Sequence, residues 1–170
     1  MEWLINFIKD IATGGNIALL GAALALICAG IGSAKAVGMA GEAAAGIVAE
    51  DPSKFVRALI LQALPGTQGI YGLIIAFLVM SKVGIIGGGV DFAAITIAEG
   101  VSLLLAALPI AIVGYKSAIM QAKVSVSSMQ IVTTHPEETT KGMIFAGLVE
   151  TYAVFALLIS FLLVSGIQIG

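Results

Sequence analysis

The residue of this sequence best suited to chemistry is Glu150, which lies in the middle of a strongly hydrophobic stretch, residues 143–164. An ionised carboxylate at the centre of a bilayer costs roughly 3 kcal/mol on insertion scales, so it is not expected to persist there without a partner. Carboxyl groups inside membrane segments usually mark the path of an ion or a proton. Polar residues able to surround Glu150 are therefore expected elsewhere in the chain.

A group of such residues lies in the run Leu-Pro-Gly-Thr-Gln-Gly-Ile-Tyr, residues 64–71. Pro65 has no amide hydrogen and clashes with the carbonyl one turn earlier, so we expect a local kink that lets a backbone oxygen nearby serve as a ligand. Spacings of three, four and seven residues place four members of the run on one stripe of a helix. These four are Leu64, Thr67, Gln68 and Tyr71.

Together with Gln121 and Glu150, this stripe offers the oxygen atoms that hard cations such as Na⁺ seek. One hydroxyl, two amide oxygens, one backbone carbonyl and one carboxylate carry a single negative charge, which suits a monovalent ion. Tyr71 is better suited to donate a hydrogen bond that holds the carboxylate in place. The predicted Na⁺ ligands are the backbone oxygen of Leu64 and the side chains of Thr67, Gln68, Gln121 and Glu150.

A proton is the alternative cargo for the same Glu150. A proton site needs little beyond the carboxyl and one donor, so the surplus of oxygens favours Na⁺. Threonine and glutamine inside membranes also hydrogen-bond across helices for purely structural reasons, and Gln121 fits an interfacial position as well.

Composition places these residues in a membrane protein. Of the 170 residues, 59% are hydrophobic and 11% are charged, against about 25% charged in soluble proteins. The net charge of −2 and the lack of a basic cluster exclude nucleic acid as a partner. Cys28 is the only cysteine, which excludes an internal disulfide. Glu2 and Asp10 beside Lys9 are atypical of a cleaved signal peptide, so the first hydrophobic segment is expected to stay in the mature protein.

Four segments are long enough to cross a bilayer, for which about 20 apolar residues suffice. No alternation of period two is present, so we expect an all-α membrane protein with four transmembrane helices. The breaks at 50–52 and 134–137 are tight turns with a proline, and the break at 84–91 is longer and rich in glycine. The expected helices are 16–49, 52–82, 92–133 and 136–165.

The second half of the chain repeats the first at an offset of 84 residues. We therefore expect two tandem hairpins of the same orientation, residues 1–84 and 85–170. Glu150 aligns with Gly66, so only the second hairpin carries the carboxylate. Aligned pairs include Pro52 with Pro136, Leu64 with Leu148, Thr67 with Thr151, Phe77 with Phe161, and Ser33-Ala34 with Ser117-Ala118.

Basic residues predict the orientation in the plasma membrane. Six of the eight lysine and arginine residues lie towards the tight turns, and only Lys9 and Lys82 lie on the other side. The positive-inside rule then places the 50–52 and 134–137 turns in the cytoplasm and both termini outside.

Small residues crowd the first helix, which lets helix backbones approach closely in lipid. A close-packed dimer and a ring with crowded inner helices both fit, and glycines on several faces favour the ring. Gly30-Ile31-Gly32 follows no strand, so a nucleotide site is not expected. We interpret the other polar residues as packed, solvated or interfacial: Tyr152, His135, Glu42, Glu99, Glu137 and Glu138.

These motifs together resemble the four-helix proteolipid subunit of bacterial Na⁺-transporting V-type (V/A-type) rotary ATPases. The resemblance covers essentially the whole chain and is carried by residues 64–71, 121–123 and 149–152 and by the Gly-rich first helix. It implies a closed rotor ring of identical copies, with the first and third helices inside and the second and fourth facing outward. It also implies that the five predicted ligands bind one Na⁺ and that Tyr71 bonds the carboxylate.

The resemblance implies partners as well. A stator subunit must supply an arginine opposite Glu150, because the only arginine of the chain, Arg57, lies near a tight turn. A central-stalk subunit is expected at the cytoplasmic turns, and membrane lipids around the ring. ATP hydrolysis or synthesis then belongs to partner subunits, and this chain is not itself an enzyme. A small secondary transporter or channel and a scaffold without transport are the other classes considered.

Overall fold

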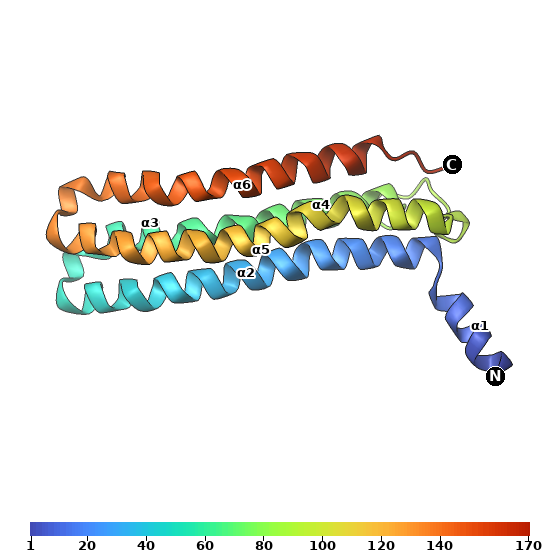
Figure 1. Ribbon diagram of the computed structural model, residues 1–170, viewed down its shortest axis with the longest axis horizontal. Helices are drawn as coiled ribbons and strands as arrows, with labels where there is room; N and C mark the ends of the chain where they lie inside the picture. The colour runs from blue at the N-terminus through green and yellow to red at the C-terminus, as the bar shows by residue number, and fades with distance from the viewer.

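The computed structural model describes the backbone of residues 1–170 and all side chains except those of residues 5, 6 and 8–10. The side chains of Lys9 and Asp10 therefore lie outside the described part. The described backbone forms helices and turns and no strand. The four longest helical segments, Gly14–Glu50, Pro52–Lys82, Ile97–Thr134 and Pro136–Gly166, run side by side (Figure 1). The elements are α1 (Glu2–Ile11), α2 (Gly14–Glu50), η1 (Pro52–Lys54), α3 (Phe55–Ala63), η2 (Leu64–Gly66), α4 (Thr67–Lys82), η3 (Phe92–Ala94), α5 (Ile97–Thr134), η4 (Pro136–Glu138) and α6 (Thr139–Gly166).

Four segments of the described chain are long and apolar enough to cross a membrane: Gly14–Glu50, Pro52–Lys82, Ile97–Thr134 and Pro136–Gly166. At about 1.5 Å per residue, α2 and α5 exceed the roughly 30 Å of bilayer hydrocarbon, so their ends extend beyond it. The all-α class with four membrane helices is thus confirmed. The short helix α1 is absent from the sequence prediction, and it exposes Trp3 and Phe7.

The start of α5 differs from the sequence prediction, because the helix begins at Ile97 instead of residue 92. Thr96 and Glu99 form a capping box, in which the Thr96 hydroxyl accepts from the Glu99 amide and the Glu99 carboxylate accepts from the Thr96 amide. This reciprocal pair satisfies the first free amides of a helix and so fixes its start. Residues 92–94 form the separate turn η3 instead.

The second membrane segment is interrupted where the sequence predicts a kink. Pro52–Lys82 consists of η1, α3, the 3₁₀ turn η2 and α4, and η2 is made of Leu64, Pro65 and Gly66. Pro65 cannot donate to the carbonyl of Leu61, so the regular hydrogen-bond ladder cannot continue through this point. The amide of Thr67 bonds the carbonyl of Leu64 three residues earlier instead.

Small residues let α2 approach its neighbours closely. α2 packs along α5 and along α3 and α4, and α5 also packs along α6. A Cβ atom at Gly32 would lie 2.7 Å from the Cα of Tyr115 on α5, and one at Gly72 of α4 would lie 2.8 Å from the Cβ of Ala29. These positions leave no room for a side chain, so glycine is required at both.

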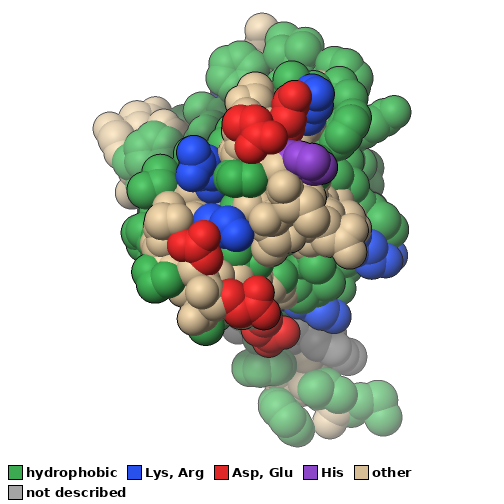
Figure 2. All heavy atoms as spheres, turned by 90° about the vertical axis from the view of Figure 1, so that its left-hand side faces the viewer, with side chains coloured by type: hydrophobic (Ala, Val, Ile, Leu, Met, Phe, Trp, Pro, Cys, Tyr) green, Lys and Arg blue, Asp and Glu red, His purple; other side chains and the backbone are tan. Residues whose placement is uncertain are grey.

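Both tight turns lie at one end of the bundle, and the Gly-rich connection and the C-terminus lie at the other (Figure 1). Figure 2 shows acidic and basic side chains gathered at the tight-turn end, together with the only histidine. Asp51 caps η1, and hydrogen bonds from the Ser53 hydroxyl and amide lower the pKa of its carboxyl below the usual value. In the Gly-rich connection, Gly84 and residues 87–89 have positive φ, which glycine adopts without strain.

The close approach of α2 to α5 generates a prediction about stability. Replacing Gly32 by alanine should destabilise the subunit by about 1–3 kcal/mol, because the added carbon forces the two backbones apart. Thermal unfolding of the detergent-solubilised protein, followed by circular dichroism, measures the effect. Gly38→Ala is the matched control, since it makes the same change in the same helix and nothing lies within 4 Å of the added atom. Equal melting temperatures of the two variants would contradict the close approach.

Candidate ion-binding site

Glu150 lies midway along α6 with a partly buried side chain, and two other helices donate hydrogen bonds to its carboxylate. The Tyr71 hydroxyl on α4 donates to Oε1 at 2.5 Å, and the Gln121 amide nitrogen on α5 donates to Oε2 at 3.4 Å. Both donors are neutral, and none of the ion pairs among the described side chains includes Glu150. The carboxylate is therefore held in position while its charge has no counter-ion from this part of the chain.

Two glutamines lie beside the carboxylate in the interior of the bundle. Gln68 on α4 and Gln121 on α5 are both 0% exposed. The Gln68 amide nitrogen donates to Oε1 of Gln121 at 2.5 Å, and it lies 3.5 Å from the Ser117 hydroxyl. Oε1 of Gln68 is buried and has no hydrogen-bond partner among the described residues. A buried amide oxygen without a partner is unusual and marks a place where an electropositive ligand gains an interaction.

The break at Pro65 positions the remaining two predicted ligands. The Thr67 hydroxyl donates to the Leu64 carbonyl at 3.2 Å, so both lone pairs of that hydroxyl oxygen stay available to a cation. The Leu64 carbonyl accepts from the Thr67 amide as well. Leu64 and Thr67 are partly buried and lie one turn before Gln68 and Tyr71.

The structure thus joins Tyr71, Glu150, Gln121 and Gln68 in one hydrogen-bonded chain, and it places the Leu64–Thr67 pair on the adjoining turn. A shallow pocket of about 380 Å³ lies next to these hydrogen-bonded residues, at the surface between α4 and α6. Tyr71 and Glu150 line it, so the carboxylate can be reached from outside the bundle. The other lining residues are Gly147, Thr151, Val154 and Phe155.

Two serines that sequence reasoning did not assign to the site support it. The Ser117 hydroxyl on α5 donates to the Val149 carbonyl on α6 at 3.1 Å, next to Glu150. The Ser33 hydroxyl on α2 accepts from the Gly69 amide on α4 at 2.8 Å, next to Gln68. Ser33 and Ser117 align in the internal repeat, so the repeat itself is the signal that could have identified them.

The donor set favours a monovalent cation on chemical grounds. It combines one carboxylate with neutral amide, hydroxyl and carbonyl oxygens, which are ligands of hard cations. No group of three or more His, Cys, Asp or Glu residues able to hold a metal occurs in the described part of the chain. A divalent ion would therefore keep an excess positive charge in an apolar layer.

Other polar residues take no part in this arrangement. Tyr152 is 66% exposed and makes an edge contact with the ring of Phe155. His135 lies in the exposed turn near Glu137, with 3.6 Å between Nδ1 and the carboxylate oxygen. Glu99 caps α5, as described above.

Comparison with known proteins adds independent information. The chain matches the family of the ATP synthase C subunit twice, over residues 20–79 and 104–163. The two matches begin 84 residues apart, which confirms the duplication predicted from the sequence.

Two relatives match most of the chain. It is 50% identical over 165 residues to the V-type sodium ATPase subunit K of Enterococcus hirae, covering 96% of this chain and 97% of the relative. It is 38% identical over 151 residues to the A-type ATP synthase subunit K of Methanocaldococcus jannaschii, covering 89% of this chain and 63% of that protein. The family resemblance predicted from the motifs is therefore confirmed: the chain belongs to the ATP synthase C-subunit family.

Proposed function

We propose that this chain is the rotor-ring subunit of a rotary V/A-type ATPase and that it carries Na⁺ across the membrane on Glu150. One observation carries the proposal: a carboxylate held by two neutral donors lies beside two buried glutamines, and one amide oxygen there lacks a partner. The chain is a non-catalytic subunit, because ATP is hydrolysed or made in partner subunits. The relative named as part of a sodium ATPase supports the choice of Na⁺.

In the proposed site, one Na⁺ is bound by five oxygen ligands and the carboxylate supplies the only charge. Tyr71 holds the carboxylate through its 2.5 Å hydrogen bond and does not itself bind the ion. The Na⁺ ligands are the backbone oxygen of Leu64, the side-chain oxygens of Thr67, Gln68 and Gln121, and the carboxylate of Glu150.

Identical copies form the ring, each contributing two hairpins, residues 1–84 and 85–170. α2 and α5 line the interior, since their small residues allow close packing, and α4 and α6 face outward. The outward position of α6 agrees with its large exposed apolar side chains, which suit contact with lipid: Phe145, Phe155, Leu158 and Leu162.

Rotation depends on whether the charge of Glu150 is neutralised. With Na⁺ bound, the site is neutral and can face lipid, whereas the empty carboxylate carries the intramembrane penalty of roughly 3 kcal/mol or more. An arginine from a stator protein stabilises the empty carboxylate electrostatically. The ion therefore enters and leaves only where the ring contacts the stator.

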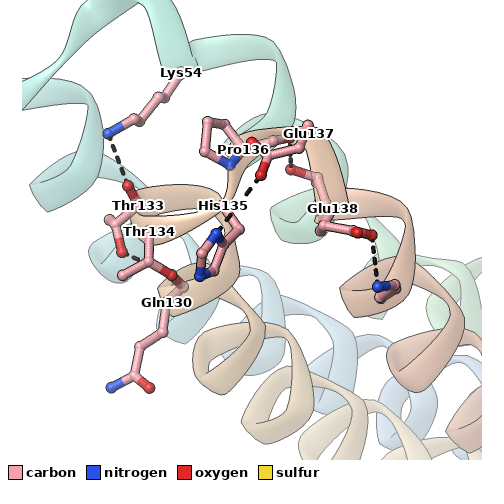
Figure 3. A network of polar contacts seen from close by, with 10 residues as sticks. Lys54, Gln130, Thr133, Thr134, His135, Pro136, Glu137 and Glu138 are labelled. Carbon is pink, nitrogen blue, oxygen red and sulfur yellow. Dashed lines mark hydrogen bonds and ion pairs between the residues drawn. The ribbon is translucent and has the colours of Figure 1, made fainter.

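The tight turns face the cytoplasm and form the surface for a central-stalk partner, while both termini lie outside. Figure 3 shows how one of these turns is fixed: Lys54 donates to the Thr133 carbonyl at 3.3 Å and so ties the first turn to the second. Lys141 and Glu138 form an ion pair of 2.8 Å on the same surface. A polar surface cross-linked in this way suits contact with another subunit.

Binding of ²²Na⁺ to the purified ring tests the role of Glu150. The natural protein should bind Na⁺ saturably, and Glu150→Gln should lose this binding because it removes the only charged ligand. Glu137→Gln is the control, since it removes a carboxylate from the exposed turn. Saturable binding that persists at full affinity in Glu150→Gln would refute the proposed site.

Carbodiimide labelling of Glu150 separates Na⁺ from H⁺ as the cargo. Carbodiimides react with a protonated carboxyl, and a bound Na⁺ excludes that proton. At fixed pH, increasing Na⁺ should therefore slow the labelling, with K⁺ at the same ionic strength as the control. Labelling that does not depend on Na⁺ would favour the proton-carrying ring.

Tyr71→Phe tests how the carboxylate is held. The substitution removes the hydrogen bond to Glu150 and should weaken Na⁺ binding roughly tenfold, which is typical for loss of one bond to a charged group. Tyr152→Phe removes the same hydroxyl from the exposed neighbour and should leave the affinity unchanged. Equal affinities of the two variants would show that Tyr71 does not position the carboxylate.

A further inference from the structure

Ser125 is a buried polar residue that the proposed site does not use. It lies on α5, is 0% exposed, and its hydroxyl has no hydrogen-bond partner among the described residues. The other such atom among the described side chains is Oε1 of Gln68, which the proposed function assigns to the ion. A buried polar atom without a partner costs free energy, so an additional ligand for Ser125 is expected.

Other serines of the same helix show the usual alternative. The Ser127 hydroxyl donates to the Lys123 carbonyl at 3.0 Å, and the Ser102 hydroxyl donates to the Ala98 carbonyl at 2.8 Å. Serines in membrane helices commonly bond the carbonyl four residues earlier in this way. Ser125 does not, although it is the most buried of the three, so its hydroxyl is free to bond a group inside the bundle.

Hydrogen bonds between α5 and α6 fix the level of Ser125. The Gln121 amide nitrogen donates to the Glu150 carboxylate, and the Ser128 hydroxyl donates to the Gly142 carbonyl at 3.4 Å. Ser125 lies between these two levels, four residues or about 6 Å from Gln121 along the helix axis towards the tight-turn end. Side chains lean towards the start of their own helix, and α4 starts at that end, so the side chain of Gln68 leans towards the level of Ser125.

A second acceptor lies on the facing segment. Pro65 has no amide hydrogen, so the Leu61 carbonyl cannot receive its usual donor one turn later. Leu61 and Pro65 are both fully buried, and α5 packs against α3 and η2, the two elements that contain them. Ser125 and the Leu61 carbonyl therefore both lie on the tight-turn side of the level at which Gln68 bonds Gln121.

We propose that Ser125 holds a water molecule that serves as an additional ligand of the bound cation. The Ser125 hydroxyl donates to the water oxygen, the water donates to the Leu61 carbonyl, and the remaining lone pair of the water faces the ion. Three polar partners are what a buried water typically has. This inference rests on the proposed function, because it requires the ion at Glu150.

Na⁺ binding to the purified ring tests the inference with Ser125→Ala. The variant should assemble normally, since it removes an unpaired hydroxyl, and should bind ²²Na⁺ roughly tenfold more weakly. Ser127→Ala is the matched control two residues away, and its affinity should equal that of the natural ring. If Ser125 only fills space in the core, the Na⁺ affinity of both variants should equal that of the natural ring.

The outcomes separate the two proposals. If the natural ring binds Na⁺ and Ser125→Ala binds it equally well, the water ligand is refuted and the proposed function stands. If the natural ring shows no saturable Na⁺ binding, both are refuted. Should Ser125→Ala rings fail to assemble, Ser125→Cys replaces them, because its thiol has nearly the same shape and bonds water poorly. The same weakening is expected there, and full affinity would overturn the inference.

Discussion

A carboxylate in the middle of a membrane helix must find inside the protein the interactions that water provides elsewhere, and the arrangement of the four helices follows from this need. Tyr71 and Gln121 approach Glu150 from two different helices, so neither hairpin alone can hold the carboxylate. Their donors are neutral and therefore fix its position without cancelling its charge. In the proposed function a mobile cation neutralises the charge, so the site acts as a carrier and not as a permanent salt bridge.

The two copies of the hairpin contribute different polar groups to the candidate site. The first retains the break at Pro65 and the polar stripe that follows it, and the second supplies Glu150 and Gln121. Ser33 and Ser117 keep equivalent roles, since each ties the first helix of its hairpin to the backbone of the second, next to Gln68 or Glu150. Shared ancestry thus explains the framework of the site, and divergence explains its chemistry.

Much of this arrangement could be predicted from sequence. Continuous hydrophobicity located the membrane helices, and proline chemistry located the break at Pro65, because both signals are local. The predicted start of α5 was wrong by five residues, because the Thr96–Glu99 capping box outweighs the apolar run that begins at residue 92. The bond between Gln68 and Gln121 and the isolation of Ser125 depend on how α4 and α5 pack, and no local pattern encodes that.

The alignment of Gly66 with Glu150 also affects how many ions the proposed ring moves in one full turn. In the proposed ring, four helices carry one ion, whereas two separate hairpins with a carboxylate each would carry two. For the same number of helices, fewer ions then cross the membrane in each full turn. The free energy of ATP hydrolysis is therefore divided among fewer ions. Each ion can then be driven against a steeper gradient.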